Sequence, residues 1–423
     1  TKLKYILETH FHADFVSGHV DLAKKTGATI VYGPMAEAGY DLYSAKDNEE
    51  FKIGDLTIKV LHTPGHTMES STFLLKDEKG NDNAIFTGDT LFLGDVGRPD
   101  LAIKSDVTMD DLAGHLFDSL RNRIMPLADN VIVYPGHGAG SSCGKSLSNE
   151  TVGTLGDQKK TNYALRADMT RDEFIKEVTD GILPPPQYFP KNAMMNKMGY
   201  ESIDKVMDRG DHALDVSAFK KEVENGAIIL DTRSQNDFVK EFIPKSLFIG
   251  IDGSFAMWVG ALITDIKQKI VFIAPEGREN EVVMRLARVG YDNAVGFLKG
   301  GVNAWKEAGE PIDQIKSVTP EQFSKDYEGE VNIVDVRKPG EHDNQHIEDA
   351  KLVSLDYIHE HLDDLNKDDN YYVHCAGGYR SVIAISILQP YGYKNLTNIE
   401  GGFDKIKTLD NVNLTATVCS STL

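Results

Sequence analysis

The chain has 423 residues, too many for a single hydrophobic core, so we expect two to four domains. Its 45 lysines and arginines against 65 aspartates and glutamates give a net charge of −20, which excludes general binding to a polyanion such as nucleic acid. Three cysteines are too few for a disulfide framework and indicate a reducing cytoplasm. No apolar run is long enough to cross a bilayer, so no membrane partner is expected.

The first part of the chain, from Tyr5 to about residue 174, mixes short apolar runs with helical stretches such as residues 109–122. This pattern predicts an α/β domain. The chain starts at Thr1 without an initiator methionine, only nine residues before its first histidine. We therefore expect a segment upstream of Thr1.

Four of these apolar runs end in turns that carry residue types found as metal ligands. The residues are His10, His12 and Asp14 after the first run, then His66, Asp89 and His137 after the later ones. Open sheets place their sites in the turns that follow strands. We therefore expect the four loops to converge on a metal.

The residue types fit two metals. His10, His66 and Asp89 would form a two-histidine, one-carboxylate face with open positions, which suits non-haem ferrous iron. His10, His12 and His66 would instead form a three-nitrogen site that suits zinc and a bound water. These residues alone leave both choices open.

A second metal would draw on Asp14, His137 and a ligand at position 15. That position holds Phe15, which cannot bind a metal. The sequence therefore favours one metal per chain.

Two further residues near this constellation have two interpretations each. Arg98 could bind an anionic substrate, or it could pair with Asp95 or Asp100. Cys143 could act as a relay thiol, or it could be a small residue in a flexible loop.

Three consecutive prolines at residues 184–186 interrupt all periodicity, and a domain boundary is expected near residues 208–212. Beyond it the chain repeats itself at a spacing of about a hundred residues. Residues 228–233 match 332–337, and each copy is an apolar strand that ends in Asp-x-Arg. We predict domains at 1–207, 208–316 and 317–423, the last two being duplicated parallel α/β sheets.

The second copy contains Cys375 in a glycine-rich loop between a strand and a helix. Such a loop can aim backbone N–H groups at the sulfur, while the helix N-terminus and Arg380 add positive potential. We therefore predict a thiolate near neutral pH that can carry a second sulfur as a persulfide. The first copy has Ala274 and Glu279 at the matching positions and so has no nucleophile.

The histidine and aspartate motifs resemble those of the metallo-β-lactamase superfamily, and the Gly-Arg-Pro-Asp stretch at residues 97–100 resembles its persulfide dioxygenases. The resemblance implies an αββα sandwich and one Fe(II) held by His10, His66 and Asp89, with zinc as the alternative. In that case His12, Asp14 and His137 orient these ligands, hydrogen-bond waters and substrate, or serve as alternative ligands. Simple polar packing is the other interpretation of these three residues. The implied substrates are a low-molecular-weight thiol persulfide and O2, and the implied product is sulfite.

The loop with four residues between Cys375 and Arg380 resembles that of the rhodanese sulfurtransferases, and the first copy resembles their inactive repeats. The combined resemblance implies a fused sulfide-detoxifying enzyme that forms or uses thiosulfate, in either direction, and self-associates as a dimer or tetramer. A zinc thioester hydrolase of glyoxalase II type with an appended rhodanese is the alternative. A non-catalytic sulfane-sulfur carrier, in which only Cys375 matters, is a third possibility.

Overall fold

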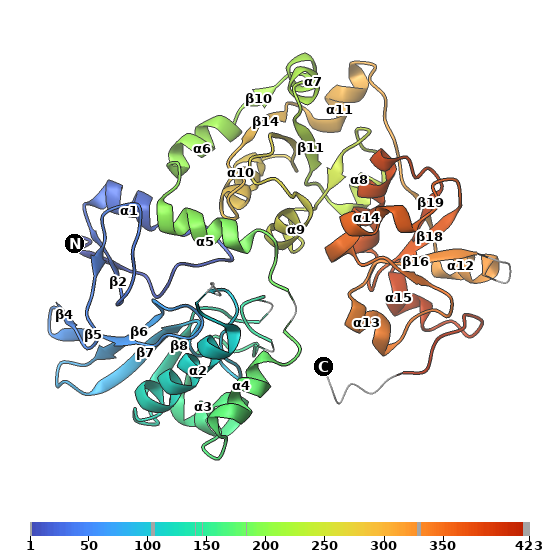
Figure 1. Ribbon diagram of the computed structural model, residues 1–423. Helices are drawn as coiled ribbons and strands as arrows, with labels where there is room; N and C mark the ends of the chain where they lie inside the picture. Colours follow the sequence, from blue (N-terminus) through green and yellow to red (C-terminus); the bar gives the residue numbers. More distant parts are fainter. Residues whose placement is uncertain are drawn as a thin grey trace. The chain divides into compact units, whose positions relative to one another are not determined.

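The computed structural model describes residues 2–102, 106–139, 141–145, 147–182, 184–327 and 331–417, so that Cys419 lies outside the described part. The chain divides into two compact units, Thr1–Ser202 and Ile203–Leu423 (Figure 1). In the described part, every helix is too short or too polar to cross a membrane.

The first unit contains two sheets. The smaller has the order β1-β2-β3 and is parallel, and the larger has the order β4-β5-β6-β7-β8-β9. Their strands are β1 (Tyr5–Leu7), β2 (Thr29–Tyr32), β3 (Tyr43–Ser44), β4 (Glu50–Ile53), β5 (Leu56–His62), β6 (Ser71–Lys76), β7 (Asp82–Gly88), β8 (Ile132–Pro135) and β9 (Gly153–Thr154).

Five α-helices accompany these sheets. They are α1 (His19–Thr26), α2 (Met109–Ser119), α3 (Leu155–Thr161), α4 (Arg171–Thr179) and α5 (Phe189–Met198). Helix α2 begins at a capping box, in which the Thr108 side chain accepts from the N–H of Asp111 and the Asp111 carboxylate accepts from the N–H of Thr108. It continues as a π-helical turn over Leu120–Ile124, so the predicted helix at residues 109–122 is present.

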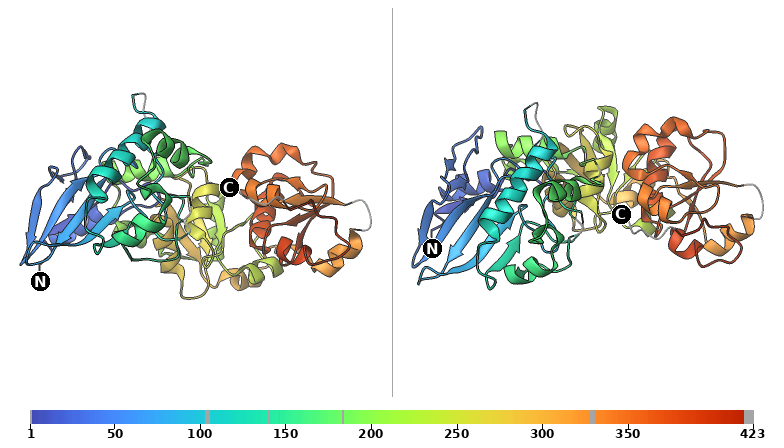
Figure 2. Two further views of the ribbon diagram at one scale, coloured as in Figure 1. Left: turned by 90° about the horizontal axis from the view of Figure 1, so that it is seen from below. Right: turned by 60° about the horizontal axis from the view of Figure 1, so that its bottom comes forward.

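Three apolar clusters define the layers of this unit. Helix α1 packs on the small sheet, with Ala23 of the helix in one apolar cluster with Ile30 of β2. Val31 of β2 packs with Val60 and Phe73 between the two sheets. Helices α2 and α4 cover the other face of the large sheet (Figure 2). The order helix, sheet, sheet, helix is the αββα sandwich that the sequence resemblance implies, and it results from burying both faces of each sheet.

The second unit contains the duplication that the sequence predicts. Both sheets are parallel and have equivalent strand orders, β10-β14-β13-β11-β12 and β15-β19-β18-β16-β17. The first repeat follows helix α6 (Ile203–Gly210). Its elements are β10 (Ala213–Leu214), α7 (Val216–Glu224), β11 (Ile228–Asp231), α8 (Gln235–Lys240), β12 (Leu247–Phe248), α9 (Phe255–Leu262), β13 (Ile270–Ile273), α10 (Glu279–Ala287), β14 (Ala294–Leu298) and α11 (Gly301–Glu307).

The second repeat has the same order of elements, except that two 3-10 turns stand where the first repeat has α9. They are β15 (Lys316–Val318), α12 (Pro320–Asp326), β16 (Asn332–Asp335), α13 (Pro339–Asn344), β17 (Lys351–Leu352), β18 (Tyr371–His374), α14 (Tyr379–Leu388), β19 (Leu396–Ile399) and α15 (Gly402–Ile406). Short 3-10 turns at Leu355–Glu360, Leu362–Asp364 and Gln389–Tyr391 join some of them. The carboxyl end of β18 therefore delivers Cys375 directly to the N-terminus of α14.

Candidate functional site

The metal-type residues of the first unit meet at the ends of their strands. Strands β7 and β8 are parallel with Phe86 opposite Tyr134, which places Asp89 beside His137 at the same edge of the sheet. The ligand atoms of His10, His66 and Asp89 all lie within 4.8 Å of one another. Each of the three residues is only 1% exposed, so the structure brings these three predicted ligands into one buried group.

The backbone around His66 fixes which ring nitrogen faces the group. Its Nδ1–H donates to the carbonyl oxygen of Arg98 at 2.9 Å, so Nε2 is left as the free acceptor, 3.3 Å from Asp89 Oδ2. His10 likewise pairs its Nδ1 with Thr9 Oγ1 at 3.0 Å and turns Nε2 toward the same carboxylate at 3.8 Å. Both rings therefore turn Nε2 toward the Asp89 carboxylate.

Glycine at position 65 lets the His66 loop reach this point. Gly65 has φ of +149°, and a Cβ atom there would come within 2.4 Å of Leu116 Cβ on α2. Only glycine permits so close a passage of the loop against the helix. The spacing Thr-Pro-Gly-His is thus explained by packing as well as by ligand position.

The Asp89 carboxylate indicates that a cation belongs here. Both of its oxygens are buried, and neither has a hydrogen-bond partner within the described part of the chain. Gly136 leaves room for it, because a Cβ at that position would lie 2.4 Å from Asp89 Oδ1. A buried carboxylate without partners is costly unless a metal or proton compensates it, and two imidazole nitrogens beside a carboxylate form a ligand set that suits a metal. The residues present therefore fit a divalent ion.

The charges of the group also suit metal binding. Burial lowers the pKa of His10 well below its usual value, and the neighbouring His12 acts in the same direction. Burial alone would raise the pKa of Asp89, but His10 and His66 outweigh it and hold that pKa well below its usual range. Neutral imidazoles and an ionised carboxylate are the forms that ligate a metal.

The other three metal-type residues form an adjoining, less buried group. His12, Asp14 and His137 also have ligand atoms within 4.8 Å of one another. Their side chains are 12–19% exposed, and His137 Nε2 lies 3.4 Å from both Asp14 Oδ2 and Asp89 Oδ2. The Phe15 ring stacks on His12 with centroids 4.4 Å apart. Position 15 therefore adds an apolar wall to this group.

Arg98 connects this site to Cys143. The Arg98 guanidinium donates to Asp100 through two bonds of 2.6 and 2.7 Å, which is the structural pairing that the sequence offered as an alternative. Its Nη1 also donates to the Ser142 carbonyl, and its backbone N–H donates to that of Cys143 at 2.9 Å. A charge paired in this way holds the Cys143 loop in place.

Cys143 itself faces the metal-type group. Its sulfur lies within 4.8 Å of ligand atoms of Asp89 and His137, and the residue is 1% exposed. Burial raises the pKa of this thiol well above its usual value, and the nearby Asp89 carboxylate adds to the shift. Cys143 is therefore held as a neutral thiol beside the site.

The second unit holds the other predicted site, at the end of β18. Cys375 is 1% exposed, and the N–H of Gly378 donates to its sulfur at 3.1 Å. The Ser381 hydroxyl lies 3.8 Å from the same atom. Gly378 has φ of +95°, a left-handed conformation that glycine adopts without strain and that turns its amide toward the sulfur.

Arg380 lies at the same loop, but its charge is shared. Its two terminal nitrogens donate to Glu341 at 2.6 and 2.7 Å. Burial alone would lower the pKa of Arg380, but the Glu341 carboxylate raises it, so the guanidinium stays charged beside Cys375. The two parallel hydrogen bonds to Glu341 fix the direction of the Arg380 side chain.

Cys375 opens into a pocket of about 370 Å³ that both repeats of this unit line. The second repeat contributes Lys338, Gly377, Tyr379 and Arg380, and the first contributes Gly253, Ser254, Met257 and Trp258. Sequence reasoning missed Lys338 and Trp258. Lys338 follows the Asp-x-Arg motif directly and could have been noticed, whereas nothing in the sequence places helix α9 beside Cys375.

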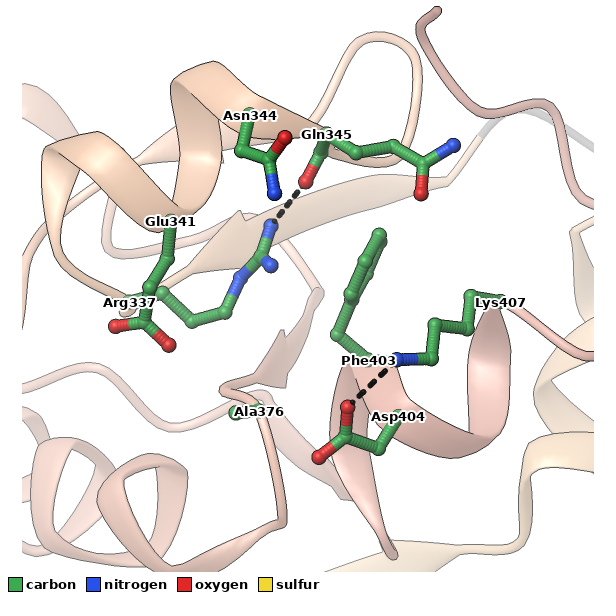
Figure 3. Close-up of a pocket in the computed structure, with 8 residues that line it drawn as sticks. All are labelled: Arg337, Glu341, Asn344, Gln345, Ala376, Phe403, Asp404 and Lys407. Atoms are coloured by element: carbon green, nitrogen blue, oxygen red, sulfur yellow. Dashed lines mark hydrogen bonds and ion pairs between the residues drawn. The ribbon is translucent and has the colours of Figure 1, made fainter. Parts of the chain in front are cut away.

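A second hollow, of about 190 Å³, lies behind the loop at Ala376 (Figure 3). There the Arg337 guanidinium packs over the Phe403 ring at 4.0 Å and donates to the Gln345 carbonyl at 2.8 Å. Lys407 pairs with Asp404 at 3.0 Å. Arg337 and Lys407 therefore already have partners of their own in this hollow.

The matching loop of the first repeat has lost the reactive residues. Arg278, one position before Glu279, forms ion pairs with Asp252 at 2.8 Å and Glu281 at 2.7 Å. Without a thiol at Ala274, the loop has no nucleophile for sulfur.

Comparisons with known families match all three parts of the chain. The metallo-beta-lactamase superfamily matches residues 1–137, and the rhodanese-like domain matches residues 215–308 and 319–409. A metallo-beta-lactamase structure from Staphylococcus aureus COL is 30% identical with a TM-score of 0.60, covering 70% of this chain and 83% of that one.

Two named relatives point to different activities. A probable hydroxyacylglutathione hydrolase of Schizosaccharomyces pombe is 33% identical over 180 residues, which is 38% of this chain and 66% of the relative. The mouse persulfide dioxygenase ETHE1 is 29% identical over 187 residues, 44% of this chain and 65% of the relative. The chain spans about half to two thirds of the length of such curated relatives.

Proposed function

Because this chain belongs to the metallo-beta-lactamase superfamily and carries two rhodanese-like domains, we propose that it is a non-haem iron persulfide dioxygenase fused to a sulfurtransferase. The observation that supports this proposal best is the buried group of His10, His66 and Asp89. Two imidazoles and one carboxylate on one face leave open positions, which suits iron and two reactants at once.

The proposed roles in the first unit follow from the contacts. His10, His66 and Asp89 would hold one Fe(II), which would supply the chemistry that joins O2 to the terminal sulfur of a thiol persulfide. His66 is oriented by the Arg98 carbonyl, and His12, Asp14 and His137 line the less buried side. Cys143, a neutral thiol, borders the space beside Asp89. One water supplies the third oxygen of sulfite and the proton of the thiol, so a thiol persulfide, O2 and water give sulfite and the free thiol.

In the second unit, the Cys375 thiolate attacks the outer sulfur of a persulfide. A new S–S bond forms, the donor's own S–S bond breaks, and the donor leaves as a thiolate. Sulfite then attacks the terminal sulfur of the Cys375 persulfide. The new S–S bond makes thiosulfate, which keeps the proton of the persulfide, and the broken S–S bond releases the Cys375 thiolate. The reverse sequence uses the same residues, so the direction follows from the supply of sulfite and persulfide.

The Cys375 pocket favours an organic persulfide over thiosulfate alone. Met257 and Trp258 offer an apolar wall for a carbon chain, while Lys338 and Arg380 offer positive charge for a carboxylate or sulfite. A low-molecular-weight thiol persulfide has both features. We further propose that the enzyme works in a reducing cytoplasm, assembles as a homo-oligomer, and has domain limits at 207 and 316.

The test is metal analysis of the purified protein together with O2 uptake after addition of glutathione persulfide. We expect iron, and O2 uptake that His66→Ala lowers at least about a hundredfold through loss of a ligand, along with loss of the iron. Sulfur transfer from thiosulfate should survive in His66→Ala. His115→Ala, a substitution on α2 outside the group, is the matched control. An unchanged iron content in His66→Ala would remove His66 as a ligand.

The alternative is a zinc thioester hydrolase, which the similarity to hydroxyacylglutathione hydrolases favours. The adjoining group of His12, Asp14 and His137 could hold a second ion. Zinc in the purified protein and cleavage of a glutathione thioester, with no O2 uptake, would establish this alternative. Neither reaction, with Cys375 still accepting sulfur, would leave only a sulfane-sulfur carrier.

A further inference from the structure

The loop that carries His12 and Asp14 is tied to a helix about 180 residues later in the chain. Asn196, on α5, donates from Nδ2 to the carbonyl oxygens of His12 and Phe15, both at 2.7 Å. Its Oδ1 accepts from the N–H of Ser17 at 2.8 Å. Asn196 is fully buried. Its side-chain amide makes three hydrogen bonds to this loop, two as a donor and one as an acceptor.

These three bonds replace the pairing that a regular element would give. Residues 8–18 form neither helix nor strand, so their backbone groups need partners from elsewhere. Both ends of the segment that holds Asp14 are bonded to the same amide. A single planar group thus sets the separation between the carbonyls of His12 and Phe15.

A second layer of contacts fixes the end of α5. The Tyr40 hydroxyl donates to the Asn196 carbonyl at 2.8 Å and meets His19 Nε2 at 2.6 Å. The Tyr200 hydroxyl bonds to the Ser17 carbonyl. The helix and the loop are therefore held together from both sides of Asn196.

We propose that Asn196 is the positioning residue of the metal-binding loop and that the end of α5 acts as a clamp which sets the affinity of the site for its metal. The clamp rests on the metal centre of the proposed function. Asn196 touches no metal-type side chain in its own bonds, and it acts through the backbone at both ends of the His12–Phe15 segment. Removing its amide frees the segment and with it the directions of His10, His12 and Asp14.

The helix supplies its own control. Asn192 lies one turn earlier on α5 and is equally buried, but its side-chain atoms have no hydrogen-bond partner in the described part of the chain. Replacement of Asn192 by alanine removes the same volume from the same helix and breaks no side-chain hydrogen bond to the loop. Asn196→Asp separates the bonds further, because it keeps an acceptor for the Ser17 N–H and loses both donations.

The experiment compares wild type, Asn196→Ala, Asn196→Asp and Asn192→Ala in the full chain. Fe(II) affinity is measured anaerobically by competition with a chelator, and hydrogen exchange at residues 12–17 is measured in the metal-free protein. We expect Asn196→Ala and Asn196→Asp to weaken Fe(II) binding about ten- to a hundredfold, the range seen when groups that support ligands are lost. The Ser17 amide should exchange faster in Asn196→Ala than in Asn196→Asp, and Asn192→Ala should match wild type in both measurements.

Two results would overturn the clamp. One is an Asn196→Ala protein with wild-type iron affinity and unchanged exchange, and the other is an equal loss in Asn192→Ala, which would show general destabilisation of α5. If wild type itself binds no iron, the proposed function fails, and the exchange of the metal-free loop alone decides whether Asn196 holds it.

Discussion

The two repeats of the second unit share their framework and differ in their loops. In both, the arginine of Asp-x-Arg turns back on the aspartate, Arg233 on Asp231 at 2.7 Å and Arg337 on Asp335 at 2.6 Å. The strand orders are equivalent as well. The ion pair at the end of β11 and of β16 is thus a property of the fold, because it is present in a repeat that has no nucleophile.

The loop after β13 and the loop after β18 share a backbone turn and differ in their side chains. Gly277 and Gly378 both have positive φ, +78° and +95°, so the turn after β13 and the turn after β18 share this backbone conformation. Only the side chains differ, with Ala274 in place of Cys375. Backbone geometry and reactivity are therefore separable here. The turn is required for packing, and the thiol is required for chemistry.

The repeat without a nucleophile still contributes to the other's site. Gln235 donates to the carbonyl of Gly378 at 2.9 Å, and the Tyr379 hydroxyl donates to Gly250 at 3.2 Å. Gly378 is the residue whose N–H reaches the Cys375 sulfur. The first repeat therefore braces the loop and walls the pocket, although it performs no transfer.

The largest effect should come from Cys375→Ser, which makes the second loop as unreactive as the first. Sulfur transfer should fall at least about a thousandfold, because a hydroxyl cannot accept sulfane sulfur. Persulfide-dependent O2 uptake should remain, since it uses the first unit. Thiosulfate formation is measured alongside O2 uptake, with Ala274→Ser as the matched control in the other loop. Loss of both reactions in Cys375→Ser would contradict independent sites.

A smaller effect should come from Trp258→Ala, which removes the wall that the first repeat contributes. The KM for an organic persulfide in sulfur transfer should rise about tenfold through lost apolar contact, while the KM for thiosulfate changes less than about twofold. Trp258→Phe should restore most of the difference. Steady-state kinetics with both donors measure this. Equal rises in both KM values would mean that Trp258 only supports the fold.

The smallest effect should be a pH dependence of the free energy of unfolding that comes from the second repeat alone. His374 stands where the first repeat has Ile273, and it lies fully buried with Nδ1 3.9 Å from Asp335. Burial lowers the pKa of His374, and Asp335 offsets this only in part. In the unfolded chain His374 takes up a proton near pH 6.5, whereas in the folded repeat it takes one up only at lower pH. The free energy of unfolding should therefore fall as the pH drops below about 6.5.

His374→Ile removes this group and should flatten that part of the profile. Chemical denaturation at pH 7.5 and pH 5.5 compares the variant with wild type. If both lose the same stability between these pH values, His374 does not cause the dependence.

The strands, the turns and the candidate ligands could be predicted from the sequence because they depend on local patterns. Apolar runs that end in Gly, Pro, His or Asp mark strand ends, and β5, β7, β8 and β18 begin or end within a few residues of those runs. The repeat was visible because the strand that ends in Asp-x-Arg recurs about a hundred residues later. Glycines such as Gly65 appear in the motif because a side chain there would collide with α2.

The partners across the fold could not be predicted in this way. Asn196, Gln235 and Trp258 belong to helices whose own sequence carries no sign of chemistry, and each matters because of a segment more than a hundred residues away. The sequence determined that His10, His66, Asp89 and Cys375 stand at strand ends, since periodicity is a local property. Only the tertiary structure decided which helix bonds to the loop of His12 and Asp14 and which repeat lines the pocket beside Cys375, because those contacts depend on how distant elements pack.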